Sequence, residues 1–171
     1  MKVTILFVCT ANMCRSPMAE GLMQRKLERE GRADQVRAAS AGVWTVDGRA
    51  ATQNAVLTMG EWGVDIRRHR SRIITDRILE NAALILTMTH SHAEALRAEF
   101  PQHASRIYLL SNMVGYDYEV EDPVGGSMLD YEETAQEIEA MIEQGYPKMM
   151  ELIGMPAGEP PPVDSGLFVH D

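Results

Sequence analysis

The chain has 171 residues, of which 45% are hydrophobic and 24% are charged, and its formal net charge is −9 at pH 7. This length and composition predict one globular domain and exclude a wholly disordered chain. The acidity argues against nucleic acid as a partner, because nucleic-acid binding needs a basic surface. No apolar run approaches the roughly 18 residues of a membrane helix or resembles a secretory signal, so we expect a cytoplasmic protein without membrane partners.

The chain opens with a pattern of strand, short loop and helix. Residues 3–9 are almost continuously apolar and β-branched, which is typical of a strand buried on both faces of a parallel sheet. Ser16 and Pro17 predict a helix N-cap followed by the first helical residue. Apolar residues then recur at helical spacing until Gly31, which is expected to end the helix.

Strands and helices continue to alternate after this unit. We predict a strand at residues 36–41, a helix at 50–60, a strand at 82–88, a short helix at about 90–99 and a strand at 107–110. Such alternation predicts right-handed crossovers and an open parallel sheet with helices on both faces. Ligands of such α/β folds bind beyond the carboxyl ends of the strands, which is where Cys9 lies.

The last third of the chain is predicted to contain a loop, a helix and a tail. Residues 111–130 predict a long acidic loop, and we interpret it as an active-site flap. A helix is predicted at residues 131–153, and Gly145 and Pro147 are expected to kink or split it. We predict a single domain at residues 1–154 and a disordered, proline-rich tail at residues 155–171.

The strongest chemical signal is a cysteine followed six positions later by an arginine. Residues 9–16 join a buried strand directly to a helix N-terminus, so successive backbone N–H groups can surround one tetrahedral anion. Arg15 at the end of this loop can contact two phosphoryl oxygens at once. The positive end of the helix and the guanidinium group favour the thiolate form of Cys9, which is the nucleophilic form.

These residues predict phosphatase chemistry. Attack of Cys9 on a phosphate monoester would give a phosphocysteine, and Ser16 is placed to hydrogen-bond the departing thiolate. This mechanism needs neither a metal nor a cofactor. Its leaving oxygen needs a proton, and Asp122 in the acidic loop is the candidate acid, although an Asp-Pro dipeptide by itself is a common turn element.

Residues 8–20, Val-Cys-Thr-Ala-Asn-Met-Cys-Arg-Ser-Pro-Met-Ala-Glu, resemble the signature of the low-molecular-weight protein tyrosine phosphatases, a family that includes bacterial protein arginine phosphatases. The resemblance extends over roughly residues 3–153. It implies a flavodoxin-like three-layer fold with a four-stranded parallel sheet, and a phosphorylated protein or small phosphate monoester as substrate. It also implies Cys9 as nucleophile, Arg15 as phosphate ligand and Asp122 as general acid.

The same resemblance implies further site residues. The implied substrate-binding set is Thr10, Ala11, Asn12, Met13, Cys14, Ser16 and Trp44. A supporting hydrogen-bond network is implied among Asn12, Ser16, Ser40 and His69. Trp44 would wall the mouth of the pocket, although a half-buried surface tryptophan is an alternative.

The choice between the two branches of the family is carried by a few positions. Met13 stands where tyrosine-directed relatives usually carry isoleucine and arginine-directed relatives carry threonine, and its apolar bulk favours an aryl phosphate. The run from Asp122 to Ser127 resembles the arginine-directed branch, but Val124 replaces an aromatic residue that is usual in both. We therefore expect a phosphotyrosine phosphatase, with a protein arginine phosphatase as the alternative.

Other functions compete with these. A redox module could use Cys9 and Cys14 alone, an arsenate reductase would need further cysteines, and a phosphate-binding module would need the loop but not the thiol. Cys14 could form a disulfide with an oxidised Cys9 or pack beneath the loop. His90 and His92 are expected to cap a helix or to face solvent rather than to bind a metal.

Overall fold

One parallel sheet organises the protein, and the computed structural model describes it within residues 1–156 and 158. Its strands are β1 (Val3–Cys9), β2 (Val36–Gly42), β3 (Leu84–Thr87) and β4 (Ile107–Leu109), in the spatial order β2-β1-β3-β4. All neighbouring strands are parallel. Cys9 pairs with Gly42, so β1 and β2 end together at the same edge of the sheet.

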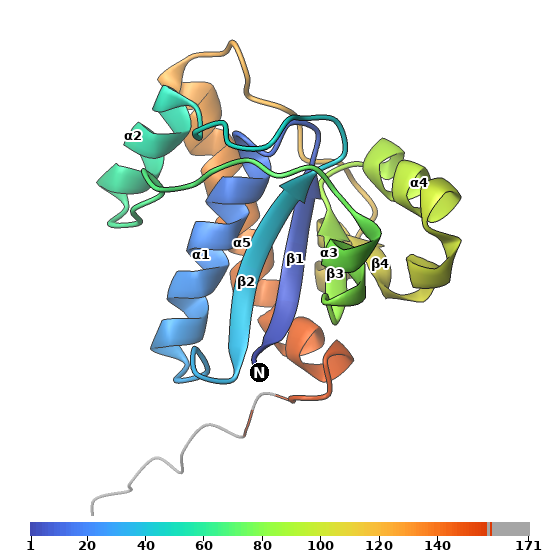
Figure 1. Ribbon diagram of the computed structural model, residues 1–171. Coiled ribbons are helices and arrows are strands. Elements are labelled where there is room, and N and C mark those ends of the chain that lie inside the picture. The colour runs from blue at the N-terminus through green and yellow to red at the C-terminus, as the bar shows by residue number, and fades with distance from the viewer. Residues whose placement is uncertain (157, 159–171) are drawn as a thin grey trace, which may run out of the picture.

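Helices cover both faces of this sheet (Figure 1). They are α1 (Arg15–Arg29), α2 (Gln53–Glu61), α3 (Asp76–Glu80), α4 (His90–Glu99) and α5 (Met128–Leu152), with 3-10 turns η1 (Pro101–Arg106) and η2 (Leu110–Val114). α1, α2 and α5 pack on one face, while α3 and α4 pack on the other. The expected flavodoxin-like three-layer fold is confirmed.

The alternation of side chains along β1 explains the two cores. Ile5 and Phe7 belong to the cluster with α1 and α5, whereas Leu6 and Val8 belong to the cluster with α3 and α4. All four side chains are fully buried. The nearly unbroken apolar sequence of this strand is therefore the result of burial on both faces, as predicted.

Of the kink or split predicted for the last helix, the split is wrong, because α5 is a single helix from Met128 to Leu152 that contains Pro147. Proline removes one helical hydrogen bond, but Tyr146 and Met149 on either side of it are buried in the core and hold the helix. Gly145 has a packing role: a Cβ there would lie 2.7 Å from Cβ of Met113. The glycine thus allows η2 to pack closely against α5.

Two further expectations concern the ends and the surface of the chain. The predicted boundary between a domain at 1–154 and a disordered tail at 155–171 stays a prediction, because most of that tail lies outside the described residues.

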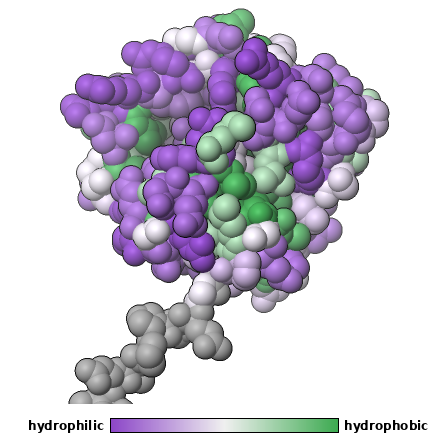
Figure 2. Space-filling view, turned by 60° about the horizontal axis from the view of Figure 1, so that its bottom comes forward, coloured by the Kyte–Doolittle hydropathy of each residue, from purple (hydrophilic) through white to green (hydrophobic). Residues whose placement is uncertain are grey.

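Within residues 1–156 and 158, no helix is long and apolar enough to cross a membrane. Figure 2 shows that the end of the molecule at the bottom of Figure 1 is mostly hydrophilic, with its most evident apolar area near the centre of the view.

Candidate active site

The loop between β1 and α1 forms the centre of the site. α1 begins at Arg15, with Cys14 as its N-cap residue and no side chain capping its first turn. The prediction that Ser16 caps this helix is therefore wrong by two residues, because its hydroxyl is used within the site instead. A helix start without a side-chain cap keeps free N–H groups and the positive end of the helix dipole available to an anion.

Backbone carbonyl groups of this loop accept hydrogen bonds, whereas its backbone N–H groups do not donate any within the described residues. The carbonyl oxygens of Cys9, Thr10 and Met13 accept hydrogen bonds from the backbone N–H groups of Val43, Trp44 and Thr52, at 2.9 to 3.0 Å. In contrast, none of the backbone N–H groups of residues 10–15 donates to another residue that the structure describes. Buried N–H groups are nearly always paired, so such a run of free donors indicates a binding site for an anion.

Gly42 makes room for this loop. A Cβ atom on Gly42 would lie 2.6 Å from the carbonyl oxygen of Thr10 and 3.1 Å from the carbonyl carbon of Ala11. Both neighbours are backbone atoms that cannot move without distorting the loop. The end of β2 therefore requires glycine so that the loop can lie against it.

Asn12 holds the shape of the loop from inside. It is fully buried and has a positive φ of 58°, which is unusual for a residue other than glycine. Its Nδ2 donates to Oγ of Ser16 (2.8 Å) and of Ser40 (2.9 Å), and its Oδ1 accepts from the N–H of Arg72 (3.0 Å). Nε2 of His69 donates to the Asn12 carbonyl oxygen at 2.7 Å. These bonds stabilise the strained conformation.

The same network orients a donor toward Cys9. Cys9 Sγ lies 2.9 Å from Oγ of Ser16, and both residues are buried. An amide nitrogen can only donate, so the Ser16 oxygen accepts from Asn12 and its own hydrogen is left for the Cys9 sulfur. A hydroxyl that donates to sulfur stabilises the thiolate more than the thiol.

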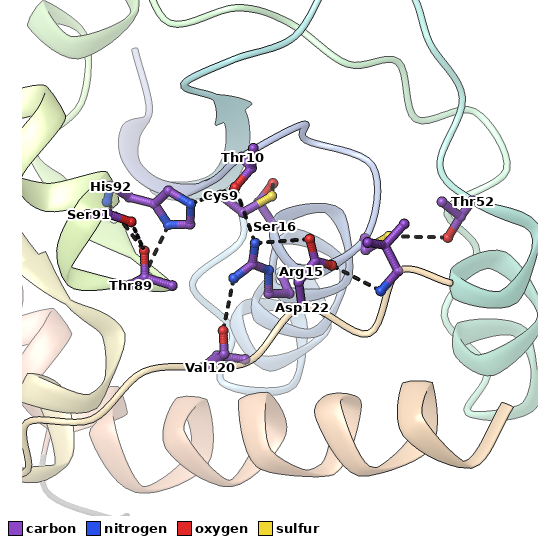
Figure 3. A network of polar contacts seen from close by, with 12 residues as sticks. Cys9, Thr10, Arg15, Ser16, Thr52, Thr89, Ser91, His92, Val120 and Asp122 are labelled. Atoms are coloured by element: carbon purple, nitrogen blue, oxygen red, sulfur yellow. Dashed lines mark hydrogen bonds and ion pairs between the residues drawn. The ribbon is translucent and has the colours of Figure 1, made fainter. Parts of the chain in front are cut away.

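Arg15 closes the loop beside Cys9 (Figure 3). Arg15 as a whole is 3% exposed; Nη1 of its guanidinium group donates to the carbonyl oxygen of Val120 at 2.9 Å, and Nη2 lies 3.4 Å from Oδ2 of Asp122. Nε is buried and has no hydrogen-bond partner among the described residues. A buried, unpaired guanidinium N–H is costly, and a bound oxyanion would satisfy it.

Asp122 comes to this loop from a segment far along the chain, as expected of an active-site flap. Its side chain remains 38% exposed, and its Oδ1 accepts a hydrogen bond from the N–H of Val124 at 3.1 Å. The carboxylate therefore lies within reach of both Arg15 and solvent, which suits a group that exchanges protons with a bound molecule.

These residues enclose one cavity of about 570 Å³. Residues from three parts of the chain line it, namely Cys9, Thr10, Ala11, Met13, Cys14, Arg15, Trp44, Thr45, Val46, Arg49, Thr52, Asp122 and Val124. Trp44 is 82% exposed and lies at the edge of the cavity. Arg49 was not predicted, because it belongs to an irregular segment without a motif.

Most of the chain matches a known protein family. The family described as low molecular weight phosphotyrosine protein phosphatase matches residues 4–151. The chain belongs to this family.

Its relatives include both branches of the family and one other activity. A protein-arginine-phosphatase of Bacillus subtilis (strain 168) is 39% identical over 141 residues, which are 82% of this chain and 92% of that protein. A low molecular weight protein tyrosine phosphatase from T. tengcongensis, known from a crystal structure, has 37% sequence identity to this chain and superposes on it with a TM-score of 0.82. The match covers 86% of this chain and 99% of that one. An arsenate reductase of Bacillus cereus (strain G9842) is 34% identical over 143 residues, 84% of this chain and 93% of that protein.

Four of the predicted site residues have side chains that do not line the cavity. Asn12, Ser16, Ser40 and His69 lie beneath the loop and contact one another or the loop backbone. Asn12 and Ser16 were expected to bind substrate. Their fully buried side chains instead support Cys9 and the loop, and the backbone N–H of Asn12, which has no partner among the described residues, remains able to contact a ligand.

Cys14 is a free thiol packed under the loop. Its Sγ lies 3.4 Å from Oγ1 of Thr52 and 3.4 Å from the hydroxyl of Tyr131. Burial raises the pKa of the Cys14 thiol and also raises the pKa of Tyr131 to about 12. Of the two predicted roles, packing is the one present here, and a disulfide with an oxidised Cys9 stays a prediction.

His92 is the polar side chain whose surroundings were least expected. The prediction of helix capping is confirmed, because His92 forms a capping box with Thr89 at the start of α4. The alternative prediction, that His92 faces solvent, is wrong, because the residue is 4% exposed and contacts Thr10. A Thr-x-x-His pattern can reveal the capping box, but no sequence signal reveals the contact with a loop so far away in the chain.

Proposed function

We propose that this protein hydrolyses phosphotyrosine in proteins, and other aryl phosphate monoesters, through a phosphocysteine intermediate on Cys9. One observation carries the proposal: the free backbone N–H groups of residues 10–15 and the unpaired Nε of Arg15 surround a buried thiol. Fixed donors suit a phosphoryl group, and they gain in strength as negative charge develops on its equatorial oxygens.

The first step is transfer of the phosphoryl group to sulfur. The Cys9 thiolate attacks phosphorus, a P–S bond forms, and the bond from phosphorus to the ester oxygen breaks. Arg15 and the loop amides hold the three equatorial oxygens, while Asp122 gives its proton to the leaving oxygen. The alcohol or phenol then leaves through the open side of the cavity.

The second step restores the enzyme. Water attacks phosphorus, the Asp122 carboxylate takes a proton from this water, and the P–S bond breaks to release orthophosphate. The electron pair returns to Cys9, where the hydroxyl of Ser16 donates to the sulfur at 2.9 Å. Stabilisation of the thiolate makes sulfur a better leaving group.

We expect Asp122→Asn to lower kcat/KM, which reports the transfer of the phosphoryl group to Cys9, by about 10²-fold for phenyl phosphate and by less for p-nitrophenyl phosphate, since nitrophenolate needs little protonation to leave. The assay measures initial rates for both substrates with metal ions chelated. Asp117→Asn is the matched control, because Asp117 lies in the same segment but pairs with His90. A wild-type protein that hydrolyses neither ester would overturn the proposed function.

Phosphoarginine is the second candidate substrate, and the similarity to the Bacillus subtilis protein-arginine-phosphatase favours it. Within the cavity, Met13 provides an apolar wall, and Arg15 and Arg49 outnumber the single carboxylate of Asp122. This lining suits an aromatic phosphate dianion better than a cationic guanidinium group. We therefore place phosphotyrosine first.

Met13→Thr tests this order of substrates. We expect the ratio of kcat/KM for a phosphotyrosyl peptide to that for a phosphoarginyl peptide to fall about ten-fold, because threonine removes apolar contact with the ring and adds a hydroxyl. Val46→Thr makes the same kind of change elsewhere in the cavity and should leave the ratio within about two-fold of wild type. If wild type prefers the phosphoarginyl peptide, the order proposed here is reversed.

The remaining alternatives use fewer of these features. A redox module based on Cys9 and Cys14 needs neither Arg15 nor Asp122, and an arsenate reductase needs further cysteines where the sequence has two. We infer that the protein acts on phosphorylated proteins or small phosphate monoesters in the cytoplasm, where reducing conditions keep both thiols free. We assign this activity to a single domain at residues 1–154.

A further inference from the structure

The side chain of His92 bridges the start of α4 and the catalytic loop (Figure 3). Its Nδ1 accepts a hydrogen bond from the backbone N–H of Thr89 at 3.2 Å, and its Nε2 lies 2.9 Å from Oγ1 of Thr10. The ring is almost completely buried. None of the roles proposed above for the site residues uses this contact.

These partners determine where the ring carries its proton. A backbone N–H can only donate, so Nδ1 of His92 has no proton, and the neutral ring carries its proton on Nε2. Nε2 therefore donates to Oγ1 of Thr10. Burial and, secondarily, the charge of Arg15 lower the pKa of His92 to about 4, although Glu119 and Asp122 act in the opposite direction. The ring thus stays neutral near pH 7.

The donor on His92 determines which way the hydroxyl hydrogen of Thr10 can point. Its Oγ1 accepts from His92 and also lies 3.4 Å from Nη2 of Arg15, so donors surround the oxygen. The hydroxyl hydrogen must then point away from both, and no acceptor for it is found among the described residues. Thr10 follows Cys9 directly and lines the cavity.

We propose that His92 is a positioning residue that holds the Thr10 hydroxyl with its hydrogen directed at an oxygen of the bound phosphoryl group. Thr10 would then add a side-chain donor to the backbone donors of the loop, and His92 would act only through Thr10. This inference rests on the proposed phosphatase activity, because it assigns a role in that reaction.

A double-mutant cycle tests the inference with p-nitrophenyl phosphate. Thr10→Val removes the hydroxyl. His92→Asn keeps an oxygen that can accept from the Thr89 N–H but is too short to reach Thr10 with a donor. We expect each change to lower kcat about ten-fold with KM within about two-fold of wild type, and the double variant to be no slower than the slower single variant. His92→Gln, whose longer amide can reach Thr10, should restore most of kcat.

Matched measurements separate positioning from simple loss of structure. His90→Asn makes the same substitution two residues away, where the side chain pairs with exposed Asp117, and should retain wild-type kcat. Nitrogen NMR of the His92 ring should show a proton on Nε2 at pH 7, and a proton on Nδ1 would overturn the inference. Additive losses in the cycle would overturn it too. If wild type does not hydrolyse the ester, the proposed function fails first and this inference fails with it.

Discussion

Cys9→Ser should lower kcat for p-nitrophenyl phosphate by about 10⁴-fold or more, because a serine hydroxyl is not ionised near neutral pH and is a far weaker nucleophile than a thiolate. Orthophosphate should still bind to the variant with nearly wild-type affinity. The loop amides and Arg15, which make the anion site, do not depend on the sulfur atom. Initial rates with metal ions chelated and calorimetric titration with orthophosphate measure the two effects.

Cys14→Ser is the matched control for this experiment. It changes the same atom in the other cysteine of the loop, where the sulfur contacts Thr52 and Tyr131 rather than the phosphate site. We expect it to keep kcat within about ten-fold of wild type, since its thiol pKa is raised by burial and no step of the reaction uses it. Turnover that survives Cys9→Ser, or that is lost equally in both variants, would contradict the assignment of Cys9 as nucleophile.

The parts of this site that depend on local sequence could be predicted from the sequence. The apolar run of β1 is explained by burial on both faces, and the end of that strand places Cys9 at the ligand-binding edge of the sheet. The helix predicted at residues 90–99 is α4, which Thr89 caps and Pro101 follows. In each case neighbouring residues determine the outcome.

The parts that depend on distant contacts could not be predicted from local pattern. His92 has the sequence of a surface histidine, but the fold places α4 beside Thr10. Pro147 usually breaks a helix, yet tertiary packing keeps α5 continuous. Each of these outcomes depends on which elements the fold brings together.

Arg15→Lys should lower kcat/KM for p-nitrophenyl phosphate by about 10³-fold although the charge is kept. The guanidinium group has donors for two tasks at once: Nη1 donates to the carbonyl of Val120, and Nε remains for the ligand. A lysine ammonium is a compact group that cannot do both from one position, and it cannot contact two phosphoryl oxygens in a planar, bidentate way. The affinity for orthophosphate should therefore fall together with the rate.

Arg49→Lys is the matched control for Arg15→Lys, because it makes the same substitution in the same cavity. Arg49 lines the same cavity but is exposed, and its side chain makes no hydrogen bond within the described residues. Exposed charges contribute little, so we expect kcat/KM within about three-fold of wild type. Thermal unfolding of both variants shows whether either has lost the fold. If Arg15→Lys kept most of its activity while folded, a positive charge alone would suffice, and the planar geometry of the Arg15 donors would not be what the reaction requires.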